Sequence, residues 1–486
     1  MMLASCCFHR SARIAVAART AVAALAVLLV ASSHARADIR LPKIFGNGMV
    51  LQQKSQVAVW GWAEPGEDVK VTLGETSATA KAGADGKWSL KIQTPAAGGP
   101  HSLVAKGKNE VKFDDVLIGE VWICSGQSNM EWTVAQSANP QEEAANAKHP
   151  QIRMIKVAHN VTDKPQDDIN GQWTVCSPES VPSFSAVGYF FARHLHNELK
   201  VPIGMINTSW GGTICEAWTS REALSADEDF KPILDRSANF QANNPNQASV
   251  LYNGMVHPLI PFGIKGAIWY QGESNVSRAE QYRKLFPAMI GDWRKRFGQG
   301  DFPFLFVQLA PFKYGHDPKL LAEQWESQLK TLAVPNTGMA VTTDIGNVAD
   351  IHPANKQDVG RRLALWAMAN SYGKKDLAYS GPLYESMTVE GQKIRLKFKH
   401  AAGGLVAGGE KPLTHFTIAG EDQNFVEAKA TIDGETVIVE SDKVAKPVAV
   451  RFGWDQHAEP NLFNKAKLPA SPFRTDNFKM VSAGAK

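Results

Sequence analysis

The stretch G-E-V-W-I-C-S-G-Q-S-N-M-E-W, residues 119–132, decides the fold of this chain. Val121, Trp122 and Ile123 can fill a strand that is buried on both faces. Small and polar residues follow at once, and core packing gives no reason for them. Ser128 is therefore predicted at the carboxyl end of a strand, where open α/β sheets place their ligands and nucleophiles.

Apolar runs of strand length alternate with helical periods from residue 116 to about residue 372. This alternation is typical of a parallel sheet with helices on both faces. It predicts a three-layer α/β core over residues 116–375. The expected strands are 201–207, 264–271, 304–309 and 339–343. One expected helix begins near residue 185, and three others cover 278–297, 319–332 and 355–371.

The segments on either side of this core have a different pattern. Residues 38–115 and 376–486 contain short runs of alternating hydrophobicity, separated by turn signals such as Asp85-Gly86 and Asp433-Gly434. We predict that each forms a β domain resembling a sandwich. The expected order along the chain is thus β, α/β, β.

The amino terminus has the features of a secretory signal peptide. Three arginines precede an apolar run over residues 20–31, and Ala35-Arg36-Ala37 offers a cleavage site. The run is shorter than the ~20 residues of a spanning helix, so we expect no membrane span. Residues 1–37 are therefore predicted to direct the protein to the periplasm or the extracellular space.

Cleavage after residue 37 would also change the charge of the protein. It removes four arginines and no acidic residue, which brings the formal net charge from +4 to zero. No basic stripe then remains to favour nucleic acid. The mature chain keeps Cys124, Cys176 and Cys215, an odd number that allows at most one disulfide, and the pairing and the oligomeric state stay open.

Four segments with candidate catalytic residues follow successive predicted strands, so they share one edge of the sheet. A serine nucleophile needs a base within reach and donors for the oxyanion. We expect His352 to take the proton of Ser128 and Asp350 to orient the imidazole. The expected oxyanion donors are the backbone N–H of Ser128, that of Gly211 or Gly212, and the side-chain amide of Gln271.

Each candidate also has a structural alternative. Ser128 could cap a helix, Gly211-Gly212 could be an ordinary turn, and Asp350 or Asp344 could serve in a turn. Gln271 and Glu273 could be hydrogen-bonded structural groups, and His352 could be a helix-entry residue. Cys124 lies within the strand and is expected to be buried and inert. The remaining polar and aromatic residues of these turns are expected to bind substrate: Gln127, Asn129, Glu131, Trp132, Glu273, Asn253 and His257, the last with a minor alternative as the base.

Five separated motifs carry a resemblance to a known family. They are G-Q-S-N-M-E-W (126–132), S-W-G-G-T (209–213), Y-N-G-M-V-H-P-L (252–259), W-Y-Q-G-E-S-N (269–275) and D-I-H-P-A-N-K (350–356). Together they resemble the sialate O-acetylesterase family of SGNH-type serine esterases, over essentially the mature chain. The turn around Ser128 lacks the second glycine of G-x-S-x-G, which argues against an α/β-hydrolase.

The resemblance implies an enzyme that removes O-acetyl groups from carbohydrates, named for 9-O-acetylated sialic acid, without metal or organic cofactor. It implies Ser128 as nucleophile, His352 as base and Asp350 as its partner. Two departures from the general SGNH pattern concern the aspartate spacing, Asp350-x-His352 instead of D-x-x-H, and Gln271 in place of an asparagine donor.

Two other functions remain as alternatives. The same chemistry could deacetylate plant polysaccharides such as xylan or xyloglucan, since acyl-transfer machinery does not depend on which sugar carries the ester. A non-catalytic carbohydrate-binding protein is disfavoured by the intact Ser128, Asp350 and His352. A metallohydrolase is disfavoured because the chain has no H-x-x-x-H or similar ligand spacing.

Overall fold

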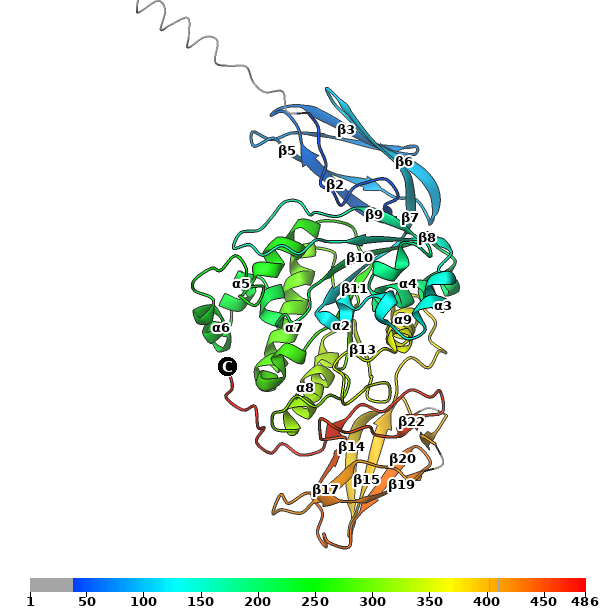
Figure 1. The fold of residues 1–486 in the computed structure, drawn as a ribbon, viewed down its shortest axis with the longest axis vertical. Helices are drawn as coiled ribbons and strands as arrows, with labels where there is room; N and C mark the ends of the chain where they lie inside the picture. The colour runs from blue at the N-terminus through cyan, green and yellow to red at the C-terminus, as the bar shows by residue number, and fades with distance from the viewer. Residues whose placement is uncertain (1–37, 402, 410) are drawn as a thin grey trace, which may run out of the picture.

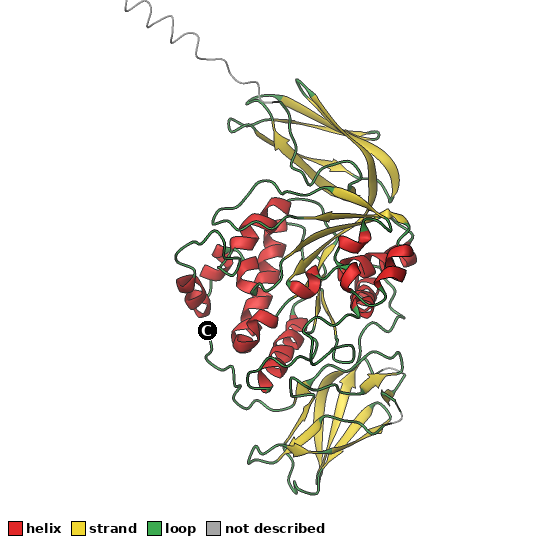
Figure 2. Ribbon diagram, viewed as in Figure 1, coloured by secondary structure: helices red, strands yellow, loops and turns green. Residues whose placement is uncertain are grey.

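The computed structural model describes residues 38–401, 403–409 and 411–486. It consists of a helix-rich middle part with strands at both ends (Figures 1 and 2). The predicted signal peptide lies outside the described residues. Among these residues, no helix is both long and apolar enough to cross a bilayer.

A sheet with six parallel strands forms the middle part of the molecule. Its central strand, β7, pairs in parallel with β10 on one side and β11 on the other. Only the edge strand β9 runs antiparallel to its neighbour. In order across the sheet the strands are β13 (Thr337–Ala340), β12 (Phe304–Val307), β11 (Gly266–Tyr270), β7 (Glu110–Gly126), β10 (Ile203–Ser209), β8 (His149–Lys156) and β9 (Trp173–Cys176).

Helices cover both faces of this sheet, as the alternating pattern predicts. On one face α4 (Ala186–Leu199) and α9 (Lys356–Ser371) pack together, and Phe191 meets Trp122 of β7 edge to face at 4.9 Å. On the other face α7 (Ala279–Phe297) packs against Trp269 of β11. The other helices are α8 (Lys319–Lys330), beside α7, and the short α2 (Ser128–Glu131), α3 (Pro140–Ala145), α5 (Arg221–Ser225) and α6 (Lys231–Arg236).

Strand β7 is long because it belongs to two parts of the molecule. Its first half pairs antiparallel with β6 (Gly98–Lys106) of the amino-terminal segment and parallel with β1 (Val50–Gln52). Asp115 has a left-handed φ of 57°, and its carboxylate binds Arg153 of β8 at 2.6 Å. The expected boundary between residues 115 and 116 therefore falls inside one continuous strand.

The remaining strands lie in the two end segments. In the first, β2 (Gln56–Trp62) pairs with β5 (Lys87–Gln93), and β3 (Asp68–Leu73) pairs with β4 (Thr76–Lys81) and β6. The second segment contains two four-stranded sheets and one pair of strands. One sheet has the order β14 (Leu383–Glu390), β15 (Lys393–Lys399), β20 (Thr436–Glu440), β19 (Lys429–Asp433), and the other has the order β18 (Val426–Glu427), β17 (Phe416–Ala419), β21 (Ala449–Phe452), β23 (Phe473–Arg474). The pair is β16 (Leu405–Ala407) and β22 (Leu462–Asn464). Both segments are thus β-rich.

The main helices begin and end close to their predicted positions because local signals fix their ends. Ser185 caps α4 by accepting from Gly188 N–H, and Asn355 caps α9 by accepting from Asp358 N–H. We predicted no strand between Ser128 and residue 185, yet β8 and β9 lie there. In β8, Pro150 and the buried Arg153 interrupt the apolar pattern. That arginine is compatible with a core strand because its guanidinium pairs with Asp115 and also donates to the carbonyl oxygens of Gly48 and Pro150.

Candidate active site

A glycine ends β7 and lets the chain turn to present Ser128. Gly126 has φ 134°, and a Cβ at this position would lie 2.1 Å from the carbonyl oxygen of Tyr270 in the neighbouring strand. Any other residue would therefore collide with β11. Ser128 is the first residue of α2, half-buried, at the carboxyl edge of the sheet.

Two residues that follow Ser128 hold His352 against the nucleophile turn. The imidazole stacks on the indole of Trp132, with ring centroids 4.3 Å apart and planes 11° from parallel. The Asn129 side chain donates to the carbonyl oxygen of Ile351 at 2.9 Å. The Nε2 atom of His352 is buried and has no hydrogen-bond partner among the described residues. This nitrogen is available to accept a proton.

Asp350 is the acid nearest His352, but the two side chains are not hydrogen-bonded. Their Oδ1 and Nδ1 atoms lie 3.9 Å apart, and Oδ1 accepts instead from the His352 backbone N–H at 2.9 Å. The Asp350 side chain is 55% exposed. Asp344, the other candidate, forms two hydrogen bonds with Arg362, each of 2.6 Å. It therefore has a structural role in holding α9.

The surroundings of His352 favour its neutral form. Burial is the main reason that its pKa lies below the usual value, and the nearby Lys356 ammonium acts in the same direction. Asp350 opposes both effects. A neutral imidazole is the form that can act as a general base.

The two glycines expected to bind the oxyanion differ in their surroundings. Gly211 lies against Ser128, since a Cβ on this glycine would be 3.3 Å from that of the serine. Its N–H, however, donates to Glu131 Oε2 at 2.8 Å. Gly212 has φ 74° and borders open space. Of the two backbone N–H groups, that of Gly212 is therefore the better candidate.

Gln271 does not present its amide to the substrate edge. The side chain is fully buried, and its Nε2 donates to the carbonyl oxygen of Thr213 at 3.1 Å and to Asn275 at 2.7 Å. Its Oε1 accepts from Tyr282 at 3.1 Å. Both amide hydrogens are thus used within the protein. The structure corrects the expected role: Gln271 supports the turn that contains Gly211 and Gly212 through Thr213.

Three residues expected to bind substrate form internal hydrogen bonds instead. Gln127 accepts from the backbone N–H groups of Gly272 and Ser274 at 3.2 and 3.4 Å. Asn129 is 1% exposed and donates to Glu273, which is also buried. These side chains fasten the nucleophile turn to the segment after β11. They are too enclosed to contact a sugar.

Glu131 links the other side of the nucleophile turn to the last residue of β8, Lys156, and to His159 just after this strand. Its Oε1 lies 3.0 Å from His159 Nε2 and 3.5 Å from Lys156 Nζ. Burial alone would raise the pKa of Glu131, but hydrogen bonds from His159 and Gly211 outweigh it, so the pKa lies below the usual value. The sequence analysis missed Lys156 and His159 because it did not predict β8, the strand that ends at Lys156.

Asn253 and His257, also expected to bind substrate, lie in other surroundings. His257 Nδ1 is 2.8 Å from the carbonyl oxygen of Gln166, and the residue lines a cavity of ≈ 500 Å³ with Trp62 and Trp88 of the amino-terminal segment. Asn253 donates to Thr162 and lines a separate cavity. Neither cavity is lined by Ser128 or His352, so the structure does not bring these two residues to the site.

Tryptophan rings flank the candidate site. Trp132 stacks on His352, and Trp210, just before Gly211, stacks on His159 with ring centroids 3.9 Å apart. Both indoles are half-buried. Trp132 and Trp210 are therefore both candidates for contact with a sugar ring.

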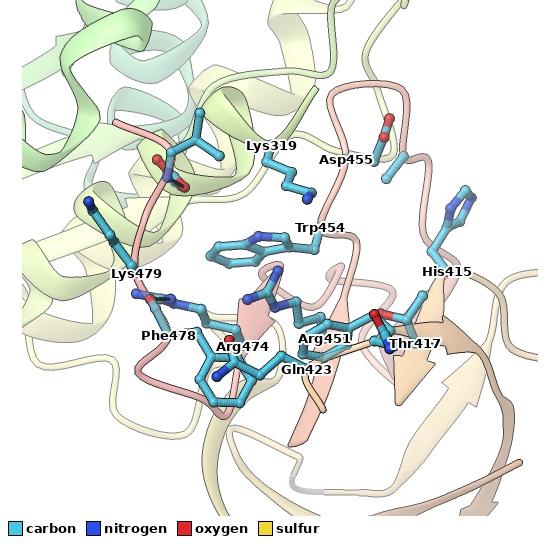
Figure 3. A pocket seen from close by; sticks show the side chains of 15 residues that line it. Lys319, His415, Thr417, Gln423, Arg451, Trp454, Asp455, Arg474, Phe478 and Lys479 are labelled. Carbon is cyan, nitrogen blue, oxygen red and sulfur yellow. Dashed lines mark hydrogen bonds between the residues drawn. The ribbon is translucent and has the colours of Figure 1, made fainter. Parts of the chain in front are cut away.

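A cavity of ≈ 600 Å³ lies away from this site, between α8 and the carboxyl-terminal strands (Figure 3). The guanidinium groups of Arg451 and Arg474 each lie 5.5 Å from the ring of Trp454. Both arginines are already paired, with Asp476 and Glu326 among their partners. None of the candidate catalytic residues lines this cavity.

The described cysteines are all unpaired. Cys124, Cys176 and Cys215 are free and buried, and burial raises the pKa of the Cys124 thiol to about 12. A thiol with such a pKa is not a nucleophile at neutral pH. Within the described ranges no three His, Cys, Asp or Glu side chains gather as metal ligands would.

Comparisons with known proteins indicate one family of esterases. A family model described as "Carbohydrate esterase, sialic acid-specific acetylesterase" matches residues 118–369. Human sialate O-acetylesterase is 32% identical over 498 aligned positions, which cover 92% of this chain and 95% of that protein, and the Pongo abelii enzyme gives the same values. The crystal structure of a carbohydrate acetylesterase from Xanthomonas citri has a TM-score of 0.85 and 43% identity, covering 91% of this chain and 100% of that one.

Proposed function

Because the chain belongs to the sialic acid-specific acetylesterase family of carbohydrate esterases, and is therefore a carboxylic ester hydrolase, we propose that it deacetylates carbohydrates through Ser128 and His352. The observation that carries this proposal is the pair of contacts from Asn129 and Trp132, which hold the imidazole against the turn that presents the serine.

In the proposed mechanism, the Ser128 hydroxyl attacks the acetyl carbonyl carbon while His352 Nε2 takes its proton. The backbone N–H groups of Ser128 and Gly212 stabilise the oxyanion. His352 then gives this proton to the sugar oxygen as its bond to the acetyl carbon breaks, so the sugar leaves as an alcohol and the acetyl group stays on Ser128. Water, deprotonated by His352, attacks this ester, and acetate leaves as the serine is restored.

Asp350 orients the imidazole in this mechanism. Its present separation of 3.9 Å from His352 Nδ1 must shorten by about 1 Å for a hydrogen bond. Catalytic hydrogen bonds are commonly long before substrate binds. The exposed position of Asp350 in a loop permits such an adjustment.

For the substrate we propose O-acetylated sialic acid, because the relatives are named sialate O-acetylesterases, and the 9-O-acetyl ester is our first candidate. One observation favours a neutral acetylated polysaccharide as the second. Lys156 and His159, the basic side chains on the Glu131 side of Ser128, both contact that glutamate. A sialate carboxylate would have to compete with Glu131 for them.

The experiment that tests the function is acetate release by the wild-type enzyme from 9-O-acetylated sialic acid, acetylated xylan and acetylated xyloglucan. We expect release from at least one of them and none above background from Ser128→Ala. A wild-type protein that released no acetate from any of the three, nor from p-nitrophenyl acetate, would refute the proposal.

We also propose that residues 1–37 are removed during secretion. Expression of the full chain with sequencing of the mature amino terminus tests this. A mature protein that begins at Asp38 in the periplasm or medium supports it, and an intact amino terminus in the cytoplasm contradicts it.

A further inference from the structure

A buried polar cluster contacts the residues next to Ser128 and His352 in the chain. Three elements contribute to it: Asn129 from α2, Glu273 at the start of the short helix η7 (Glu273–Arg278) and Lys356 at the start of α9. Lys356 Nζ donates to Asn129 Oδ1 at 2.6 Å, and Asn129 Nδ2 donates to Glu273 Oε1 at 2.6 Å. We call these three residues the buried triad.

The hydrogen bonds of Asn129 are complete and directional. Its oxygen accepts from Lys356, and its two amide hydrogens go to Glu273 and to the carbonyl oxygen of Ile351, the residue before His352. An asparagine amide can turn by 180° and exchange its oxygen and nitrogen. The Lys356 ammonium offers only donors, so it fixes the orientation in which the amide holds Ile351.

Simple core packing does not explain this cluster. Lys356 is 0% exposed, and burying an ammonium or a carboxylate is costly even when the two are paired. One carboxylate oxygen of Glu273, Oε2, is buried with no hydrogen-bond partner among the described residues. Such a cluster in the core points to a role beyond stability.

The charged and titratable groups around Lys356 come from several elements. Glu273 and Asp350 face it, His352 lies four residues before it, and the Tyr270 ring of β11 lies 5.5 Å from its ammonium. Burial lowers the pKa of Lys356 to about 7, against the effect of the two carboxylates. In its charged form Lys356 in turn lowers the pKa of His352.

We propose that the buried triad positions His352 for catalysis: Lys356 fixes the Asn129 amide, and Asn129 holds the Ile351 carbonyl so that the imidazole stays against Ser128. These are positioning residues, because none of them is exposed enough to touch substrate. The inference rests on the proposed esterase function.

The test compares Lys356→Met and Lys356→Arg by kcat, KM, pH profile and melting temperature with p-nitrophenyl acetate. Lys356→Met should lower kcat by about tenfold to a hundredfold with KM little changed, since a displaced base slows chemistry more than binding. The acidic limb of kcat/KM should move to higher pH, because a cation beside His352 is lost. Lys356→Arg, which keeps the donor and the charge, should restore part of kcat.

Arg294→Met is the matched control. Arg294 is also a buried cation on a helix, but it donates to the carbonyl oxygens of Phe302 and Asn336, near the start of β12 and β13 and so at the opposite edge of the sheet. This variant should lose stability and keep both kcat and the acidic limb. Equal kinetic losses in Arg294→Met and Lys356→Met would overturn the proposal.

Asn129→Asp keeps the shape of the side chain and serves if Lys356→Met does not fold. The aspartate still accepts from Lys356 but cannot donate to Ile351, so kcat should again fall with KM little changed. Wild-type kcat and pH profile in a folded Asn129→Asp or Lys356→Met enzyme would overturn the positioning role alone, provided that Ser128→Ala is inactive. A wild-type enzyme without esterase activity would overturn this inference together with the proposed function.

Discussion

The two sides of the nucleophile turn are built differently. On the His352 side, Asn129 belongs to a triad that is closed to solvent, with every hydrogen bond of its amide satisfied. On the Gly211 side, Glu131 pairs with Lys156 and His159, and all three side chains are partly exposed. The buried side fixes one geometry, whereas the exposed side forms ion pairs that water and substrate can reach.

The difference indicates a division of roles within four residues of α2. A base must stay within hydrogen-bond reach of its serine, and buried contacts restrict it well. A sugar pocket must admit different parts of a substrate, and half-exposed groups such as Glu131 and Trp210 can rearrange. The predictions below test whether this division holds.

The largest loss of activity is expected at Ser128, the residue that both sides of the turn surround. Ser128→Ala should leave the fold intact and lower kcat by ~10⁴ or more, because the catalytic residues act as a unit. Steady-state kinetics and a melting curve check this. Near wild-type activity in Ser128→Ala, with activity lost in Cys124→Ala, would mean that the wrong nucleophile has been named.

The pH profile tests the buried side. Since burial and Lys356 lower the pKa of His352, its neutral form should persist to a pH below the usual histidine pKa of about 6.5. Activity should therefore stay high as pH falls through 6.5 and decline only at lower pH, about tenfold per unit. kcat/KM measured between pH 4 and 8 gives the result. An acidic limb above 6.5 would contradict it, as would activity in His352→Asn with an unchanged limb.

The two aspartates near His352 should separate kinetics from stability. Asp350→Asn should lower kcat clearly less than Ser128→Ala and leave the melting temperature nearly unchanged, because the side chain is exposed. Asp344→Asn should keep kcat and lose about 2 kcal/mol of unfolding free energy, since Arg362 loses a charged partner. kcat and chemical denaturation of both variants decide this, and the reverse pattern would show that Asp344 is the orienting acid.

The smallest effect is expected on the exposed side. Glu131→Gln keeps an acceptor for Gly211 N–H but removes the charge that pairs with Lys156 and His159. We expect kcat on p-nitrophenyl acetate to change by less than about threefold, in keeping with weak exposed ion pairs. KM for an acidic sugar ester should fall, because the Lys156 ammonium and the His159 imidazole become free to bind the substrate carboxylate. A loss of kcat as large as that of Asn129→Asp would break the comparison between the two sides.

Local patterns predicted much of the fold and the central residues of the site. The expected helix over 278–297 corresponds to α7, and the expected strand over 264–271 contains β11. Both were predictable because hydrophobic periodicity and the turn or capping residues at element ends are local properties of the sequence. The position of Ser128 at a strand end followed in the same way. The prediction failed at β8, where the charge of a buried arginine is paired by Asp115, a residue 38 positions earlier in the chain.

Side-chain direction, by contrast, followed from contacts between distant segments. The sequence by itself determined the α/β order, the strand-end position of Ser128 and the placement of Asp350 and His352 after the last strand of the core. Only the tertiary structure decided that Asn129 and Glu273 turn inward to meet Lys356, that Gln271 supports a turn, and that Glu131 meets His159. The physical reason is that a polar residue at a strand end can face either substrate or protein, and the partners that choose between them lie up to 227 residues apart along the chain.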